Sequence, residues 1–310
     1  MSISRFNSIR LTTSNVDGQK ILLEEVGGKL AVNSSEVITK GSDSIILSNL
    51  PTTDPETDNQ LWNDNGTLKI SSASGFSNVF SASFDQDKLE TTYTFTSTTT
   101  FSTSVWLKAP SENGNAHFVS NSDAGGSEMR VVLGVKNGNY QIYIGSGQWK
   151  TDSVSASALL DGDWHNLILT IDGTNTNGVN LYLDGNTTPV VTATSTQSIT
   201  AGTAPLFFGT GWASFYDYLG FMDEVAIWET VLSTSDVSDI GGGGAPTDLT
   251  SYSPVGWWRF GDGTGDTNSS SASPANGDTV GTIVDQGSGG NDATQTTASL
   301  RPTFSTDVPT

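Results

Sequence analysis

The chain has 310 residues, no cysteine and a formal net charge of −20 from 33 acidic and 13 basic side chains. A chain of this length can bury a hydrophobic core. The absence of cysteine excludes disulfides and thiolate metal sites. Because the acidic excess repels phosphates and anionic lipids, we expect no nucleic-acid partner. No segment approaches the ~20 apolar residues that cross a bilayer, and the first residues, MSISRFNSIRL, do not resemble a signal peptide, so we expect no membrane insertion.

The first 74 residues contain two predicted β-hairpins joined by a connector. The segments 22–35 (LLEEVGGKLAVNSS) and 61–72 (LWNDNGTLKISS) share an apolar start, an acidic turn with glycine and a second alternating run. Pro51 and Pro55 lie between them and cannot donate hydrogen bonds to a β-ladder. Hairpins alone are marginally stable, so we expect residues 1–74 to attach the protein to other molecules and to take part in oligomerisation.

Residues 75–245 are predicted to form an all-β domain. Short alternating apolar runs are separated by clusters of Gly, Ser, Thr, Asn and Asp, and no long stretch keeps a helical period. The candidate strands are FSTSVWLKA, AHFVSNS, MRVVLGV, NYQIYIG, WHNLILTID, VNLYLDG, PLFFG and FMDEVAIWE. This number of strands favours a sandwich of two sheets.

The stretch 161–185, DGDWHNLILTIDGTNTNGVNLYLDG, shows this pattern in two successive runs. Leu167, Leu169 and Ile171 share one face of the first run, and polar residues alternate with them, as expected for a strand with one buried face. Each run ends in Asp-Gly, where glycine tolerates a positive φ and aspartate bonds to the turn backbone. His165 shares the apolar face, so we expect a core imidazole hydrogen-bonded to the backbone.

The end of the chain is predicted to contain one short helix followed by loops. LSTSDVSDI (232–240) has Ser233 as N-cap and Asp236 in a capping-box position. GGGGAP (241–246) then interrupts the chain, and residues 261–280 are rich in loop-forming residues. We therefore treat 246–310 as a C-terminal extension.

Three motifs in the middle of the chain, DGDWHNLILTIDG, NLYLDG and GFMDEVAIWETVLSTSDVSDI, resemble the laminin-G/pentraxin branch of the concanavalin-A-like jelly rolls. The resemblance covers residues 75–245 and implies two packed antiparallel sheets. GWWRFGDG and DQGSGGNDAT resemble segments that usually open such domains, yet here they follow the body. Either residues 246–310 complete the sandwich in permuted order, or they begin a truncated second copy. We favour the first, because the segment is too short for a second jelly roll.

The phrase LPTTDPETDNQLWNDNGTLKIS, together with PTDLTSYSPVGWWRFGDG, resembles structural proteins of tailed bacteriophages, especially marine and cyanophage-like ones. This resemblance implies a virion protein, either a tail fibre or a capsid decoration or cement protein. It also implies that the N-terminal region contacts other virion proteins and that the chain forms a homo-oligomer, for which we expect a trimer.

Catalysis is not expected from the sequence. Glycosidases of this fold use closely spaced carboxylates on one strand, commonly Glu-x-Asp-x-x-Glu, about 5 Å apart for a retaining pair. In DEVAIWE (223–229), Asp223 and Glu229 share a parity but are too far apart, and alternation turns Glu224 to the opposite face. A Ser-His-Asp site needs an oriented histidine, and the chain has only His117 and His165.

Asp223 is a candidate metal ligand because alternation directs its carboxylate towards the core, and a buried charge needs a partner. Backbone N–H groups could supply one. Alternatively, a calcium ion could take oxygen ligands from Asp223 and from Asp123 and Glu128 in the loop NSDAGGSE. The resemblance to jelly rolls that bind calcium at a rim implies the second option.

The segment GTGWASFYDYLG (209–220) concentrates aromatic residues that could stack against sugar rings. The candidate glycan-binding residues are Trp212, Phe215, Tyr216 and Tyr218. Alternatively, these side chains cover the edge of the sandwich or form a subunit contact. The sequence thus predicts a noncatalytic virion surface protein that displays a lectin-like jelly roll and can bind host surface glycans. The alternatives are a dedicated carbohydrate-binding adhesin and, less favoured, a polysaccharide-degrading glycoside hydrolase.

Overall fold

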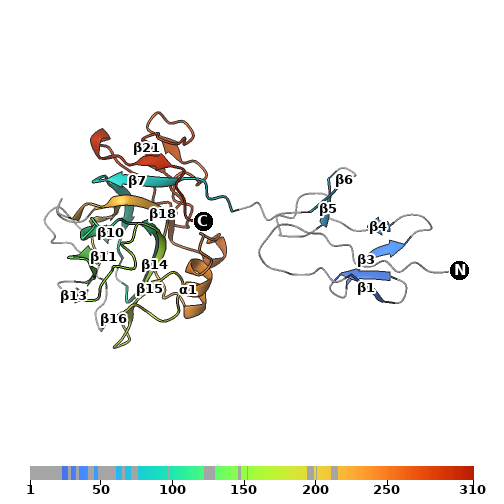
Figure 1. Ribbon diagram of the computed structural model, residues 1–310, viewed down its shortest axis with the longest axis horizontal. Helices are drawn as coiled ribbons and strands as arrows, with labels where there is room; N and C mark the ends of the chain where they lie inside the picture. Colours follow the sequence, from blue (N-terminus) through green and yellow to red (C-terminus); the bar gives the residue numbers. More distant parts are fainter. Residues whose placement is uncertain are drawn as a thin grey trace. The chain divides into compact units, whose positions relative to one another are not determined.

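The computed structural model describes the protein as two compact units, Met1–Phe76 and Ser77–Thr310. In the second unit the described residues are 77–96, 98–121, 130–145, 148–151, 153–193, 199, 201–210 and 216–310. In the first unit they are Phe76 and the strands named below. Figure 1 shows the chain coloured along its sequence.

The described strands of the N-terminal unit form two antiparallel sheets. One has the strand order β1 (Leu23–Val26), β2 (Lys29–Val32), β3 (Ser35–Lys40) and β4 (Ile45–Leu47). The other pairs β5 (Leu61–Asp64) with β6 (Thr67–Ile70). The β1–β2 and β5–β6 pairs confirm the two hairpins predicted from the sequence.

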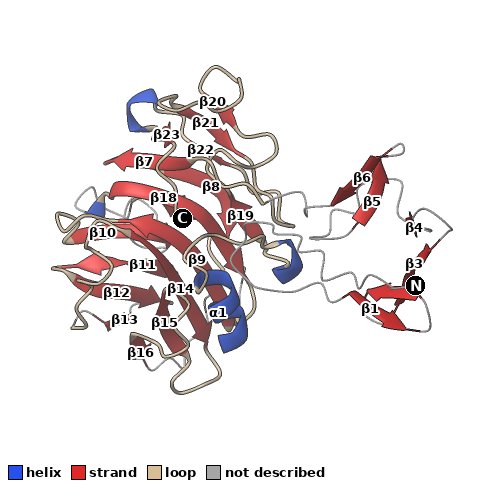
Figure 2. Ribbon diagram, turned by 45° about the vertical axis from the view of Figure 1, so that its right-hand side comes forward, coloured by secondary structure: helices blue, strands red, loops and turns tan. Residues whose placement is uncertain are grey.

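Residues 77–310 form an all-β jelly-roll sandwich of two antiparallel sheets, as predicted (Figure 2). The nine-stranded sheet has the order β13 (Gln148–Thr151), β12 (Asn139–Ile144), β11 (Val131–Lys136), β10 (Asn115–Asn121), β17 (Pro205–Phe208), β8 (Leu89–Thr94), β22 (Ala293–Thr294), β21 (Val280–Ile283) and β20 (Thr267–Asn268). The eight-stranded sheet has the order β16 (Val191–Ala193), β15 (Val179–Leu183), β14 (Trp164–Asp172), β9 (Thr100–Lys108), β18 (Leu219–Trp228), β7 (Ser81–Asp85) and β23 (Thr303–Ser305), and β19 (Gly256–Trp258) pairs with β18.

The side-chain alternation in 161–185 determines which face of β14 and β15 is buried. Leu167 pairs with Leu183 and Leu169 with Leu181, and these apolar side chains face the core between the sheets. The turn after β15 has positive φ at Asp184 (51°) and Gly185 (63°). A Cβ on Gly185 would lie 2.2 Å from the backbone nitrogen of Gly242, so this turn also needs glycine for its close approach to the end of the helix.

The predicted helix is confirmed as α1 (Thr234–Gly241). Ser233 is its N-cap, and reciprocal hydrogen bonds between Ser233 and Asp236 form the capping box. The helix lies beside β14, against the outer face of the eight-stranded sheet (Figure 2), and buries Val237 and Ile240. Two 3-10 turns, Thr250–Tyr252 and Ala298–Leu300, follow it. Among the described residues, no helix is both long and apolar enough to cross a membrane.

The segment from residue 246 onward contributes strands to both sheets. β19 pairs with β18, β22 with β8 and β23 with β7. Trp258 of β19 is completely buried, and its indole N–H donates to the carbonyl of Asn291 at 2.8 Å. These strands therefore complete the one sandwich and do not begin a second copy.

Candidate functional site

A β-bulge in β18 interrupts the alternation at Asp223 and Glu224, and both side chains are buried. Asp223 pairs with Trp106 and faces outward from the eight-stranded sheet, not towards the core as predicted. The register between β18 and β9 shifts between Asp223 and Ala226, and Glu224 has a φ of +47°. The side chains are 0% and 2% exposed, respectively. The prediction that alternation separates the two carboxylates was therefore wrong, because a bulge inserts an extra residue and interrupts the period of two.

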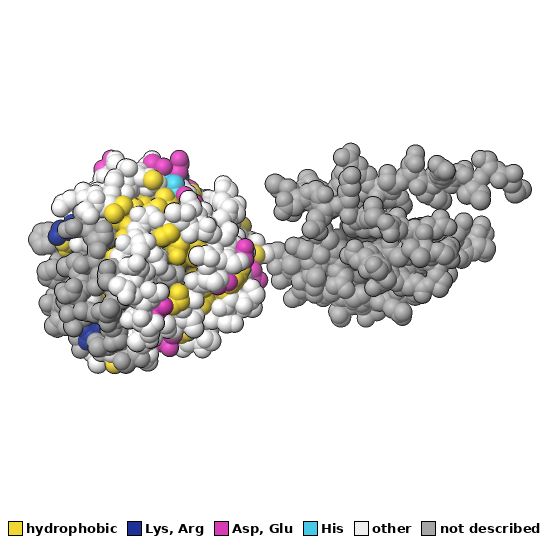
Figure 3. Space-filling model, turned by 90° about the horizontal axis from the view of Figure 1, so that it is seen from below, with side chains coloured by type: hydrophobic (Ala, Val, Ile, Leu, Met, Phe, Trp, Pro, Cys, Tyr) yellow, Lys and Arg dark blue, Asp and Glu magenta, His cyan; other side chains and the backbone are white. Residues whose placement is uncertain are grey.

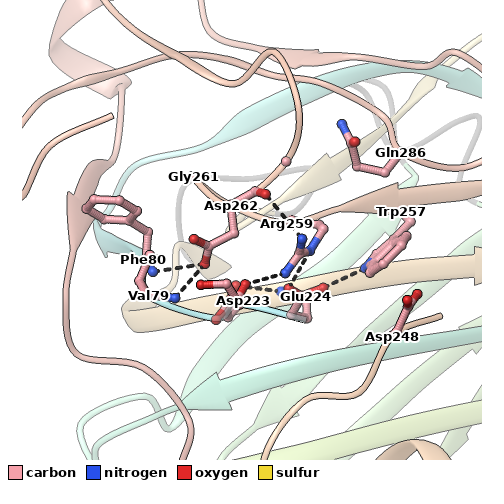
Figure 4. Close-up of polar contacts among 12 residues, drawn as sticks. Val79, Phe80, Asp223, Glu224, Asp248, Trp257, Arg259, Gly261, Asp262 and Gln286 are labelled. Atoms are coloured by element: carbon pink, nitrogen blue, oxygen red, sulfur yellow. Dashed lines mark hydrogen bonds and ion pairs between the residues drawn. The ribbon is translucent and has the colours of Figure 1, made fainter. Parts of the chain in front are cut away.

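Glu224 accepts hydrogen bonds from Trp257 of β19 and from Arg259, which directly follows that strand (Figure 4). The Trp257 indole N–H donates to Oε2 at 2.5 Å, and Arg259 Nε donates to Oε1 at 2.9 Å. Burial raises the pKa of Glu224 to about 7, although the charge of Arg259 and these hydrogen bonds act in the opposite direction. This carboxyl group therefore fastens β19 to β18.

The same cluster includes the residues that lead into β7 (Figure 4). Arg259 also donates to the carbonyl oxygens of Asp262 (3.1 Å) and Ser77 (2.6 Å). Asp262 Oδ2 accepts the backbone N–H groups of Val79 (2.8 Å) and Phe80 (2.9 Å). The network thus joins β18, the segment after β19 and the start of the sandwich.

Asp223 accepts the backbone N–H of Glu224 at 2.8 Å, which is the backbone alternative considered from the sequence. Burial raises its pKa well above the usual range, and the neighbouring Glu224 raises it further. Asp123 and Glu128, the other predicted calcium ligands, lie outside the described residues. Within the described part of the chain, no group of three or more His, Asp or Glu side chains could hold a metal ion. The described residues therefore do not supply a set of carboxylate ligands for a calcium ion at Asp223.

Of the four predicted glycan-binding aromatics, the structure describes two, Tyr216 and Tyr218. Trp212 and Phe215 lie outside the described residues. Tyr216 is half-buried, and its ring stacks on that of His117 at 4.3 Å between centroids. His117 is fully buried, and desolvation lowers its pKa to about 4, so the stacked imidazole is neutral at pH 7.

Tyr218 was predicted to face a glycan, but it is 0% exposed and its ring lies in the core. It packs against Phe84 and Phe118, with centroids at 5.9 Å and 5.4 Å. Its hydroxyl lies 2.7 Å from the carbonyl oxygen of Phe221. The prediction that Tyr218 faces a ligand was wrong, because the chain entering β18 turns this ring into the core.

His165 was predicted to bond to the backbone, but it lies between two carboxylates at the rim of the sandwich. Nδ1 is 2.8 Å from Asp184 Oδ2, and Nε2 is 3.0 Å from Asp161 Oδ1. The hydrogen bond to Asp184 is the largest cause that raises the pKa of His165 to about 9, so the imidazole is charged at pH 7.

A half-exposed group on the outer face of the eight-stranded sheet was not predicted. Trp164 (β14), Lys108 (β9) and Phe221 (β18) are register partners on three adjacent strands. The two ring centroids are 6.3 Å apart, and Lys108 Nζ lies 5.8 Å from the Phe221 centroid. Asp307 accepts hydrogen bonds from Lys108 Nζ at 2.7 Å and from the Trp164 indole at 2.9 Å. We call these four residues the aromatic platform.

Alternation in the sequence could have placed Trp164, Lys108 and Phe221 on outer faces. It could not have shown that they are neighbours, because strand order and register come from long-range pairing. Asp307 comes from the segment after β23, and no local motif links it to the other three.

Comparison with known proteins identifies the family. Residues 81–238, about half of the chain, match the family model of the concanavalin A-like lectin/glucanases superfamily. The chain belongs to this superfamily. No curated protein sequence is detectably similar to it.

Solved structures agree with the superfamily fold. A putative carbohydrate-binding protein from Bacteroides ovatus has a TM-score of 0.53 and 15% identity over 74% of this chain. The chain spans 61% of that protein's length. A heptameric SAP-like pentraxin from Limulus polyphemus has a TM-score of 0.42 and 15% identity, covering 53% of this chain and 82% of the pentraxin. The first of these likenesses supports the jelly-roll fold of this superfamily member.

Proposed function

We propose that the protein is a noncatalytic carbohydrate-binding protein whose jelly roll binds saccharides. The superfamily contains both lectins and glucanases, and the state of the β18 carboxylates favours the lectin alternative. Asp223 and Glu224 are buried, and Glu224 is bonded to Trp257 and Arg259. A glycosidase needs two carboxyl groups on either side of an accessible scissile bond. These two groups are not accessible to a polysaccharide.

Binding to a glycan array with the intact protein tests this function, and release of reducing sugars from the bound polysaccharides tests the catalytic alternative. We expect binding to at least one saccharide class without release of reducing ends. Sustained turnover would contradict the noncatalytic assignment, and failure to bind any glycan would contradict carbohydrate binding itself.

We further propose that this binding domain is part of a bacteriophage virion, as a tail fibre or capsid decoration protein that contacts host glycans. The resemblance of residues 50–71 and 246–263 to phage structural proteins supports this role. The separate N-terminal unit supports attachment through residues 1–74 to other virion proteins and oligomerisation, with a trimer as the expected state. Deletion of residues 1–70 should leave a folded sandwich that no longer enters particles. Normal incorporation of the truncated protein would refute attachment through this region.

Calcium binding by Asp123, Glu128 and Asp223 stays a proposal. If the ion binds the folded state, millimolar calcium should raise the melting temperature and a chelator should lower it. An unchanged melting temperature under both conditions would count against the site.

A further inference from the structure

The aromatic platform differs from the neighbouring row of side chains on the same sheet face. Both rings of the platform are half-buried, and the side chains of Lys108 and Asp307 are 30% and 36% exposed. The next outward-facing row consists of Asn166, Trp106 and Asp223, which are 3% exposed or less. Because that row is covered while the platform row is partly open, the platform retains surface that a ligand can contact.

Asp307 and Lys108 are held in position, but their mutual contacts do not use all of their hydrogen-bonding capacity. Asp307 is tied to β7 because its carbonyl oxygen accepts the Ser81 hydroxyl at 2.6 Å. Burial tends to raise the pKa of its carboxyl group, but the hydrogen bonds from Lys108 and Trp164 outweigh this and lower the pKa. A carboxylate can accept about four hydrogen bonds and an ammonium group can donate three. The pair therefore keeps acceptors and donors available beside the rings.

This combination matches the two kinds of surface on a pyranose. The C–H face of a sugar ring is apolar and stacks on aromatic rings, whereas the hydroxyl groups at its edge both donate and accept hydrogen bonds. Leu219, two residues before Phe221 on the same strand face, is 39% exposed and extends the apolar surface beyond one ring. The platform can therefore contact more than a monosaccharide.

The charge of the protein limits the ligand class. The formal net charge of the chain is −20, and the face of the sandwich drawn in Figure 3 carries groups of acidic side chains and few basic ones. Lys108 is already paired with Asp307, so it does not provide an uncompensated positive charge. Anionic saccharides such as uronates or sialosides would be repelled.

We propose that the aromatic platform is a binding site for uncharged oligosaccharides, with a pyranose stacked against Trp164 and Phe221 and its hydroxyl groups bonded to Asp307 and Lys108. This inference rests on the proposed carbohydrate-binding function and assigns its location and ligand class.

The test is calorimetric titration of the full chain with malto-, cello-, manno- and galacto-hexaoses and with sialylated and uronate oligosaccharides of similar length. We expect a neutral hexaose to bind at least tenfold more tightly than the anionic ones. Trp164→Ala should weaken that binding at least tenfold, and Lys108→Met, which keeps the alkyl stem, should weaken it several-fold. Phe207→Ala is the matched control on the nine-stranded sheet, because Phe207 of β17 is a half-buried ring with Lys88 Nζ 5.9 Å from its centroid, and it should change the affinity less than twofold.

A second measurement does not depend on the folding of the alanine variant. Trp164→Phe identifies the indole N–H resonance of Trp164 in a nitrogen–proton correlation spectrum of the wild-type protein. That resonance should shift during the hexaose titration, because its hydrogen-bond partner Asp307 lies at the proposed site. An unmoved resonance in the presence of bound sugar would overturn the platform site.

The outcomes separate this inference from the proposed function. Binding that is retained in Trp164→Ala, or that is weakened equally in Phe207→Ala, would overturn the platform while leaving carbohydrate binding intact. Preference for an anionic saccharide would overturn the ligand class. Absence of binding to every saccharide in the panel and on the glycan array would overturn both proposals.

Discussion

Arg259 should contribute more to stability than its position near the surface suggests. Its side chain is 13% exposed, it forms an ion pair with the 2% exposed Glu224, and it donates to the carbonyl groups of Asp262 and Ser77. Removing one partner of a buried pair leaves an uncompensated charge and commonly costs about 3–5 kcal/mol. Because the guanidinium is partly exposed, we expect Arg259→Met to lower the free energy of unfolding by about 3 kcal/mol at pH 8.

The cost should depend on pH with a defined sign. The folded-state pKa of Glu224 is about 7, above its ordinary value of 4.5, so below pH 5 the carboxyl is largely protonated even with Arg259 present. The ion pair is then already lost. We therefore expect the variant to lose about 1–2 kcal/mol at pH 5, from the hydrogen bonds alone.

Urea denaturation at both pH values measures these differences. Arg301→Met is the matched control, since Arg301 donates from Nε to the carbonyl of Gln295 at 2.5 Å and should cost about 1 kcal/mol at either pH. Adding Glu224→Gln to Arg259→Met should recover at least about 1 kcal/mol at pH 8, because the unpaired charge is removed. A loss for Arg259→Met that equals the control, or that is the same at both pH values, would refute the reasoning.

Three further predictions concern single residues. The pKa of His165 is raised to about 9, so the stability from its carboxylate contacts should be complete below pH 6.5 and lost as the pH rises through 9. Because Asp161 and Asp184 are nearly half exposed, these contacts should contribute about 1 kcal/mol to the free energy of unfolding. The difference in melting temperature between wild type and His165→Gln should therefore narrow between pH 6 and pH 10, and a constant difference would contradict the prediction. The pKa of His117 is lowered to about 4, so wild type should lose up to about 3 kcal/mol as the pH falls from 6.5 to 4. A proton titration of this imidazole with a midpoint above 6 would exclude that loss. Gly138→Ala should lower the free energy of unfolding by about 1 kcal/mol, because Gly138 has a φ of +72° but open space around its Cβ position. Gly185→Ala should lower it by about 2–4 kcal/mol, because the added Cβ would also meet Gly242. Equal losses in urea denaturation would show that the contact with Gly242 is relieved.

The sequence predicted the features that depend on local pattern. The alternation in 161–185, the Asp-Gly turns and the capping box at Ser233 specify strands, turns and a helix from residues close together in the chain. The sandwich followed from these elements, because apolar strand faces must pack against each other.

The candidate site could not be predicted to the same extent, because its residues are brought together by pairing between distant segments. Glu224 became a buried anchor through a bulge that the alternation argument does not anticipate. Its partners, Trp257 and Arg259, lie more than thirty residues later in the chain. Likewise, Asp307 reaches Lys108 across 199 positions of sequence, so no spacing rule identifies the aromatic platform.

The strands supplied by the C-terminal segment have a consequence for synthesis on the ribosome. The central strand β18 and the early strands β7 and β8 each receive a neighbour from beyond residue 255. Until that part of the chain emerges, the nascent polypeptide presents unpaired backbone edges on both of its layers, which are templates for aggregation. A premature stop near residue 245 should therefore yield an insoluble product rather than a smaller native domain, even though most strands have already been translated.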